Sequence, residues 1–236
     1  MWERFLDLST RYPLDLLAHL SSLLPILLGL IRFRQLNRAG IWIWLLFIFF
    51  FSKDSYSLWL VLFARSTTFV QNVEAFFQVI FISLIFYWSF ESKRSRQIIV
   101  GVLVFSLAGI SYTYSSSNVS TMSMAIVRIV SIGLSLAYFN KVLVDMRIKN
   151  ILLHTMFWFG AGLLVYASGT FFSMLFSEYW YGDITQVPAE IFDRYWNICQ
   201  ILFIIFCCIT SVGLWVSKRD RENFVDSTRK SQKIAL

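Results

Sequence analysis

Of the polar and ionisable residues within the strongly apolar stretches of the chain, ten are candidates for a functional site. They are Asp15, His19, Asp54, Gln71, Glu74, Gln78, Arg128, Tyr166, Asn197 and Gln200. An ionisable side chain at the centre of a membrane helix costs on the order of 2.5–3.5 kcal/mol on insertion scales, so such residues are functional candidates by default. Their groups suit hydrogen bonding and ion pairing, and we predict that these ten residues bind a ligand.

The spacing of these residues places several of them on shared helical faces. Asp15 and His19 are four residues apart, and Gln71, Glu74 and Gln78 follow the pattern i, i+3, i+7. Side chains three or four residues apart are neighbours on a helix surface. Each group therefore presents one polar stripe rather than scattered polar atoms.

Recognisable catalytic and metal-binding motifs are absent from the sequence. Two His residues and no Cys-x-x-Cys pair exclude the usual zinc sites, and there is neither a Gly-x-Ser-x-Gly motif nor a phosphate-binding glycine loop. Residues 195–216 contain no lysine, so a retinal Schiff base of the microbial rhodopsin type has no attachment point. We expect no metal, no cofactor and no enzymatic activity, although Asp54 and Glu74 could in principle act as acid and base.

The composition is that of a membrane protein. Hydrophobic residues make up 57% of the chain and charged residues 15%, against about half and about a quarter in soluble domains. The net charge of +7 does not indicate nucleic-acid binding, because the basic residues are distributed over alternate loops rather than one face. The expected partner is the lipid bilayer.

Seven apolar stretches are long enough to cross the bilayer, which takes about 20 residues. We predict an all-α bundle with spans at about 12–31, 41–63, 68–90, 97–113, 122–143, 151–176 and 195–216. Residues 1–216 would form the membrane domain, and residues 217–236 a basic tail. The second span has a polar middle at 52–55, and we interpret it as one helix rather than a re-entrant pair. Pro25 predicts a kink in the first span.

The basic residues also predict a direction. Fifteen of the 21 Lys and Arg lie in the loops after the first, third and fifth spans and in the tail. Only Arg4, Arg11, Arg65 and Arg194 lie on the opposite side. The positive-inside rule therefore predicts an external N-terminus and a cytoplasmic C-terminus, in a multi-pass protein of the bacterial inner membrane.

This direction assigns a depth to each polar residue, and nearly all of them fall in the outer halves of the spans. The inner halves are mostly Leu, Ile, Val and Phe, with His154 expected at the cytoplasmic boundary. We predict an outward-facing polar cavity above an apolar floor. Two alternatives stay open: a structural network that locks the helices together, and a path for protons or ions. Lys53 could be buried or could extend to the outer interface.

Several segments carry a resemblance to a known family. They are LLPILLGLIRFRQL at 23–36, Asp54 in the second span, Asn72-Val-Glu74, FWFGAGLLVYASGTFFSMLF at 157–176, and the YWN…LWVSK frame of the last span. With these segments the chain resembles an uncharacterised seven-helix integral membrane protein family of Bacteroidetes. Members of that family often are encoded beside sensor histidine kinases. The resemblance implies a role in sensing or signalling, with a histidine kinase or another membrane protein as partner.

Three functions are consistent with these features. The first is a sensor-like receptor that binds a small molecule or lipid from the outer side and signals to a partner. The second is a small-solute or proton-coupled transporter, which requires a polar path to the cytoplasm. The third is a structural subunit of a membrane complex, which requires a broad apolar face and no pocket.

Overall fold

The computed structural model describes residue 3, residue 6 and residues 10–114, 120–145, 150–175 and 189–220. Every regular element among these residues is a helix. The elements are α2 (Pro13–Ser21), α3 (Leu23–Ile31), η1 (Phe33–Gln35), α4 (Arg38–Leu62), α5 (Thr68–Ser89), α6 (Lys93–Tyr112), α7 (Thr121–Asp145), η2 (Ile151–Leu153), α8 (Thr155–Leu175) and α10 (Ala189–Asp220).

With α2 and α3 counted as one span, seven helices are long and apolar enough to cross a membrane. The prediction of an all-α bundle with seven helices able to span a membrane is therefore confirmed. The second span is one continuous helix, α4, as expected, so residues 52–55 do not form a re-entrant turn. The last helix continues to Asp220, beyond the predicted end at 216. Residues 221–236, most of the predicted tail, lie outside the described residues.

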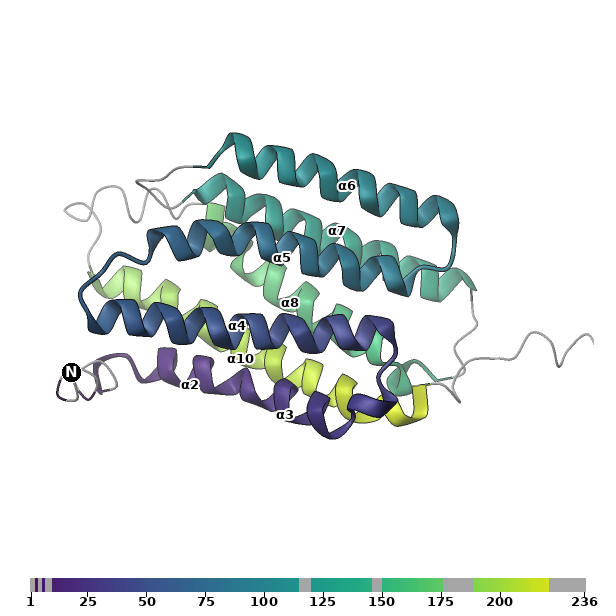
Figure 1. Ribbon diagram of the computed structural model, residues 1–236, viewed down its shortest axis with the longest axis horizontal. Coiled ribbons are helices and arrows are strands. Elements are labelled where there is room, and N and C mark those ends of the chain that lie inside the picture. The colour runs from purple at the N-terminus through teal and green to yellow at the C-terminus, as the bar shows by residue number, and fades with distance from the viewer. Residues whose placement is uncertain are drawn as a thin grey trace, which may run out of the picture.

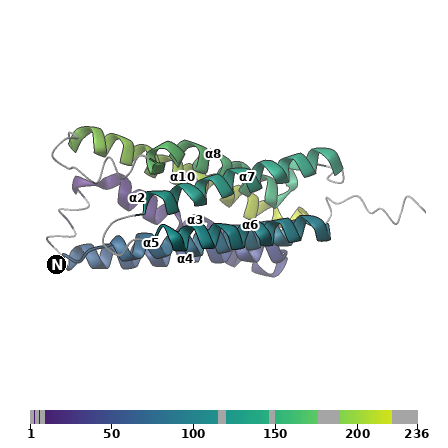
Figure 2. The ribbon, with the colours of Figure 1, turned by 90° about the horizontal axis from the view of Figure 1, so that it is seen from above.

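The helices run up and down along one long axis, so that successive connections lie at opposite ends (Figure 1). One end holds the starts of α2, α5, α7 and α10 and the ends of α4, α6 and α8; we call it the N-terminal end. The other end, the C-terminal end, holds η1, η2 and the last turn of α10. Each helix packs on the next in sequence, and α10 closes the bundle against α2 and α3. Figure 2 shows α4, α5 and α6 on one side and α7, α8 and α10 on the other.

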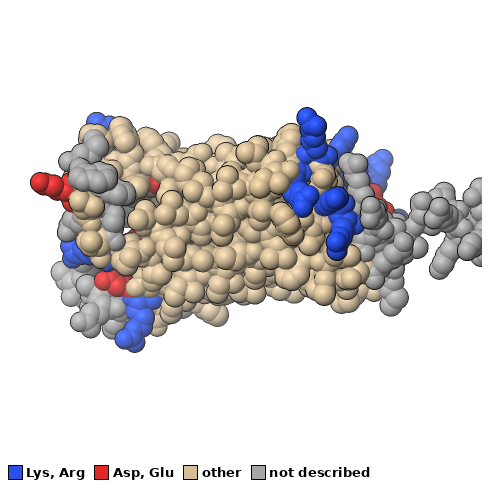
Figure 3. Space-filling model, turned by 90° about the horizontal axis from the view of Figure 1, so that it is seen from below, with Lys and Arg blue, Asp and Glu red and all other residues tan. Residues whose placement is uncertain are grey.

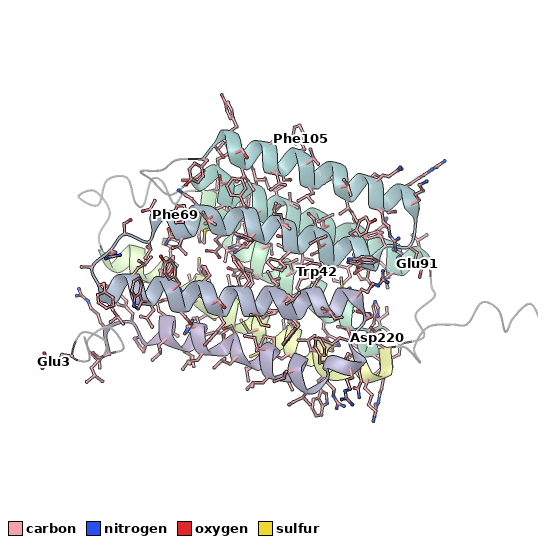
Figure 4. The ribbon with its side chains drawn as sticks, in the orientation of Figure 1. Glu3, Trp42, Phe69, Glu91, Phe105 and Asp220 are labelled. Atoms are coloured by element: carbon pink, nitrogen blue, oxygen red, sulfur yellow. The ribbon has the colours of Figure 1, made fainter. Side chains whose placement is uncertain are left out.

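Charged residues gather at the two ends of the bundle. Figure 3 shows one face on which the broad middle carries no Lys, Arg, Asp or Glu. Large apolar side chains are exposed on the opposite side as well; Phe105 on α6, labelled at the top of Figure 4, is 84% exposed. At the C-terminal end, Arg32 lies over the ring of Trp215 and Arg38 over the ring of Trp88. Such a surface suits a lipid environment with cations and aromatic rings at one interface.

The first span is broken at Ser22, between α2 and α3. Pro25 lacks the N–H that would bond to the carbonyl of Ser21, and its ring crowds that carbonyl. The hydroxyl groups of Ser21 and Ser22 instead donate to the carbonyls of Ala18 and His19, each at 2.6 Å. The kink predicted from Pro25 is therefore present.

The buried residues of α4 lie mainly in the half of that helix toward the C-terminal end of the bundle. On α4, the buried residues cluster between Ala39 and Phe50, and between Phe51 and Leu62 only Leu60 is buried. A helix that is buried along one half and only partly covered along the other leaves space beside its second half. This space lies at the N-terminal end.

A buried polar cluster lies at the C-terminal end of the bundle, the end at which His154 was expected, and it joins α7, α10 and the starts of α8 and α4. His154 is 3% exposed; its Nε2 meets the Tyr138 hydroxyl and its Nδ1 lies 2.5 Å from Asp220 Oδ1. Because a carboxylate only accepts, Nδ1 is the donor in that bond. The other oxygen of Asp220 accepts from the Asn37 side chain at 3.3 Å, and Asn37 also caps the start of α4. Figure 4 labels Asp220 at this end of the molecule.

Candidate functional site

A cavity of about 410 Å³ lies at the N-terminal end of the bundle. Its walls come from α2, α4, α5, α7, α8 and α10, and Tyr12 and Thr67 line it close to that end. Eight of the ten predicted site residues line it: Asp15, His19, Asp54, Gln71, Glu74, Arg128, Tyr166 and Gln200. The structure thus brings together side chains that are up to 185 positions apart in sequence. Whether they bind a ligand stays a prediction.

An ion-pair cluster between α4 and α5 forms one wall. Lys53 Nζ lies 2.5 Å from Asp54 Oδ1 and 3.1 Å from Glu74 Oε2. The Lys53 side chain is only 18% exposed, so it is held inside the bundle and does not extend to the outer interface. One ammonium group placed between two carboxylates offsets the repulsion that they would otherwise exert on each other.

The polar network continues from Glu74 to the opposite wall. The Gln78 amide donates to Glu74 Oε1 at 2.5 Å, and its carbonyl accepts from Arg128 Nη1 at 3.3 Å. Arg128 Nη2 donates to the Tyr166 hydroxyl at 3.0 Å, and the guanidinium lies 4.5 Å from the centre of the Tyr166 ring. This chain of contacts links α4, α5, α7 and α8.

A second polar wall joins the first and last spans. Trp196 Nε1 donates to Asp15 Oδ1 at 2.8 Å, which ties α2 to α10. His19 stacks on Phe51 of α4, and its Nε2 lies 3.3 Å from the Ser55 hydroxyl. His19 Nδ1 is buried without a partner. Asp15 therefore connects α2 to α10, and His19 connects α2 to α4. All three helices contribute to the cavity walls.

Aromatic rings close the bottom of the cavity toward the C-terminal half. Phe50 and Phe203 line it and contact each other at a centroid distance of 5.6 Å. Beneath them, Phe206 stacks on Tyr166 at 5.4 Å and contacts Phe47 at 5.2 Å. These rings are the apolar floor expected from the sequence. Below it lies the packed core.

Two predicted residues do not line the cavity. Gln78 is buried behind the wall, where it bridges Glu74 and Arg128. Asn197 is not among the described residues that line the space, because it follows Trp196 on α10 and so points to another side of that helix. Conversely, Lys53 and Trp196 line the cavity but were not among the ten. Trp196 lies four residues before Gln200 and therefore on the same helical face, and this spacing could have predicted Trp196 as a lining residue.

Metal binding finds no support in the described ranges, where no three His, Cys, Asp or Glu side chains come together in a way that could hold an ion. The cavity instead combines a polar network with apolar side chains such as Leu58, Val61 and Met124. Concave sites of this size and mixed lining are typical of small-molecule binding.

Comparisons with known proteins do not add a relative. No protein-family model matches the chain, and neither the curated proteins nor the solved structures yield a significant match. The resemblance to the Bacteroidetes family therefore stays a prediction, and the function is argued from the cavity.

Proposed function

We propose that the chain is a receptor-like protein of the bacterial inner membrane that binds a small molecule or lipid in the cavity at its N-terminal end. The positive-inside rule supports an external position for that end, because the basic residues concentrate at the opposite one. In this orientation a ligand enters from outside the cell. The observation that carries the proposal is a cavity with polar walls over a closed aromatic floor.

A signal can leave the cavity through α10. This helix contributes Trp196 and Gln200 to the walls, Phe203 and Phe206 to the floor, and Asp220 to the buried cluster at the other end. A ligand that repositions the upper part of α10 therefore acts on the same rigid element that ends beside η2 and the start of α4. The partner in this proposal is a histidine kinase or another membrane protein.

Transport is the competing function, and the floor argues against it. A carrier needs a second arrangement that opens the site to the other side. The rings of Phe50, Phe203 and Phe206 close that route here, and the polar network stops at Tyr166. Uptake of a solute into proteoliposomes that is abolished by Glu74→Gln would favour the transporter instead.

A role as a structural subunit is the third possibility, and such a role does not require a cavity. It predicts that filling the cavity leaves the behaviour of the protein unchanged and that a stoichiometric partner co-purifies. The receptor proposal predicts instead that the cavity is the functional part.

Screening for stabilising ligands tests the proposal. The melting temperature of the protein in lipid nanodiscs is measured against a broad panel of small metabolites and lipids, because a ligand that binds the native state raises it. The matched variants are Ser57→Trp, which fills the cavity, and Tyr56→Trp, on the neighbouring exposed position. We expect at least one compound to stabilise the wild type and Tyr56→Trp but not Ser57→Trp. Equal stabilisation of all three proteins would contradict the proposal.

A further inference from the structure

Arg128 has more hydrogen-bond donors than the protein satisfies. The residue is 3% exposed, and its guanidinium carries five N–H groups. One N–H of Nη1 donates to Gln78 and one of Nη2 donates to Tyr166, while the buried Nε–H has no acceptor. A buried donor without an acceptor costs about 1–3 kcal/mol, and more when the group is charged. The site therefore has a surplus of positively charged donors next to the cavity.

The nearby carboxylates do not remove this surplus. Both oxygens of Glu74 are engaged, one by Gln78 and one by Lys53, and Lys53 also holds Asp54. Among the described residues no Asp or Glu forms an ion pair with Arg128. Within the part of the chain that the structure describes, the guanidinium meets an amide carbonyl, a hydroxyl group and an aromatic ring.

Depth separates Arg128 from the acidic entrance. Arg128 is seven residues into α7, about 10 Å along the helix from the N-terminal end, whereas Asp15 lies about 3 Å into α2 at the same rise per residue. Between these depths the lining includes Leu58 and Met124, while Asp54 and Glu74 line the cavity near the depth of Arg128 and are both paired with Lys53. A ligand that fills this space meets the Arg128 guanidinium at depth, beside two carboxylates that Lys53 already holds, then apolar side chains, and the Asp15 carboxylate at the mouth.

We infer that the ligand is an amphipathic monocarboxylate, with its carboxylate on Arg128 and its apolar body along the cavity wall. A planar carboxylate matches the fork of the guanidinium and accepts two parallel hydrogen bonds. A second anionic group at the far end of the ligand would meet Asp15 and is disfavoured. This inference rests on the proposed function, since it names the chemistry of the ligand for the same cavity. Two sources share this chemistry: a soluble aryl or alkyl acid, and a free fatty acid from the bilayer.

Three probes that share one apolar body test the inference: 3-phenylpropionate, 3-phenylpropan-1-ol and 3-phenylpropylamine. Their dissociation constants are measured by titration calorimetry with the full chain in nanodiscs free of fatty acid, and oleate is titrated separately to test the bilayer source. We expect a carboxylate probe to bind at least about tenfold more tightly than the alcohol, because a charge-assisted hydrogen-bond pair replaces a neutral one. The amine should bind more weakly still.

Variants assign the binding to Arg128 and to the cavity. Arg128→Gln should remove the preference for the carboxylate. Arg128→Lys should reduce this preference, because the planar fork of the guanidinium is lost. If Arg128→Gln fails to fold, the comparison of Arg128→Lys with the wild type tests the role of Arg128. Ser57→Trp should abolish binding of every probe, with Tyr56→Trp as the control.

The possible results separate this inference from the proposed function. Binding of the alcohol or the amine as tight as that of the acids, and lost in Ser57→Trp, would overturn the carboxylate assignment while supporting a ligand cavity. Absence of binding by both acids would also overturn the assignment, whereas the broader stability screen decides on the receptor. Tight binding of 3-phenylpropionate or of oleate alone supports the assignment and identifies the source.

Discussion

Lys53, Asp54 and Glu74 form the charge cluster on which the polar wall of the cavity depends. The ammonium group is shared by two carboxylates from two helices, and little of it is exposed. Removing one partner of such a cluster leaves uncompensated charge in a poorly hydrated place, which is more harmful than the absence of the whole cluster. The cluster therefore acts as a unit, and single substitutions should not be additive.

Lys53→Met tests this dependence. It leaves Asp54 and Glu74 facing each other without a cation, and we expect a loss of about 3 kcal/mol in the free energy of unfolding. The double variant Lys53→Met/Glu74→Gln should recover part of that loss. The measurement is reversible unfolding in mixed micelles, with Lys218→Met on an exposed position of α10 as the control. A double variant less stable than Lys53→Met would contradict the account.

Tyr166→Phe isolates one hydrogen bond of the network. The substitution removes the acceptor of Arg128 Nη2 but keeps the ring that stacks on Phe206. We expect a destabilisation of about 1–2 kcal/mol, in the range found for hydrogen bonds to charged groups, seen as a lower melting temperature. Tyr112→Phe, at a side chain that is 92% exposed, should have no effect. Equal effects of the two variants would show that the Arg128 bond contributes nothing.

At the scale of elements, α8 and α10 approach each other closely at Gly213, where the absence of a side chain makes the contact possible. A Cβ at Gly213 would lie 2.9 Å from Trp158 Cβ and 3.0 Å from the carbonyl oxygen of Thr155. Neither atom is the end of a flexible side chain, so neither can move away without shifting the backbone. This contact holds the C-terminal half of α10 against the start of α8.

Gly213→Ala should therefore separate α8 from α10. We expect a loss of about 1–3 kcal/mol, as for overpacking in a core, measured as a decrease in melting temperature. Gly133→Ala is the matched control, because nothing lies within 4 Å of the Cβ that it adds on α7. That control should be neutral or slightly stabilising, since alanine is the better helix former. A Gly213→Ala protein as stable as Gly133→Ala would refute the close contact.

The last turn of α10 is held by the cluster of His154, Tyr138 and Asp220. Asp220→Ala removes the carboxylate that accepts from the His154 Nδ1–H and from the Asn37 amide. We expect faster amide hydrogen exchange over residues 213–220, together with a modest loss of stability of about 1–3 kcal/mol. Lys218→Ala in the same turn should leave exchange unchanged. Unchanged exchange in Asp220→Ala would mean that the cluster does not hold the helix end.

The sequence predicted elements better than it predicted contacts between distant positions. Apolar length and alternating loop charge were sufficient for seven spans, and depth within each span was sufficient to gather Asp15, Asp54 and Arg128 at one end. The burial of His154 was not predicted, because its partner Asp220 is 66 residues away, in a segment assigned to a polar tail. Whether Lys53 is buried could not be predicted either, because its burial depends on an ion pair with Glu74, which lies on another helix. Such contacts depend on how each helix is rotated about its own axis, and the sequence of one span does not determine that rotation.

At the scale of the whole molecule, the bundle is asymmetric along its axis. One end is hollow and lined with polar groups, and the other is packed, basic and closed by the Asp220 cluster. In the proposed orientation, the hollow end faces the outside of the cell. Fusions at the C-terminus test the direction alone: a green fluorescent protein should be fluorescent there and an alkaline phosphatase inactive. Active alkaline phosphatase at the C-terminus would invert the assignment.

The central claim is that a solvent-accessible cavity opens at the N-terminal end toward the outside of the cell. It is tested most directly by labelling Ser57→Cys, on a background without Cys199, Cys207 and Cys208, with a membrane-impermeant maleimide on intact spheroplasts. We expect rapid labelling of Ser57→Cys, at a rate comparable with that of the loop control Arg65→Cys. Ser135→Cys should not be labelled, because this position is fully buried on α7. Labelling of Arg65→Cys but not of Ser57→Cys would contradict the claim.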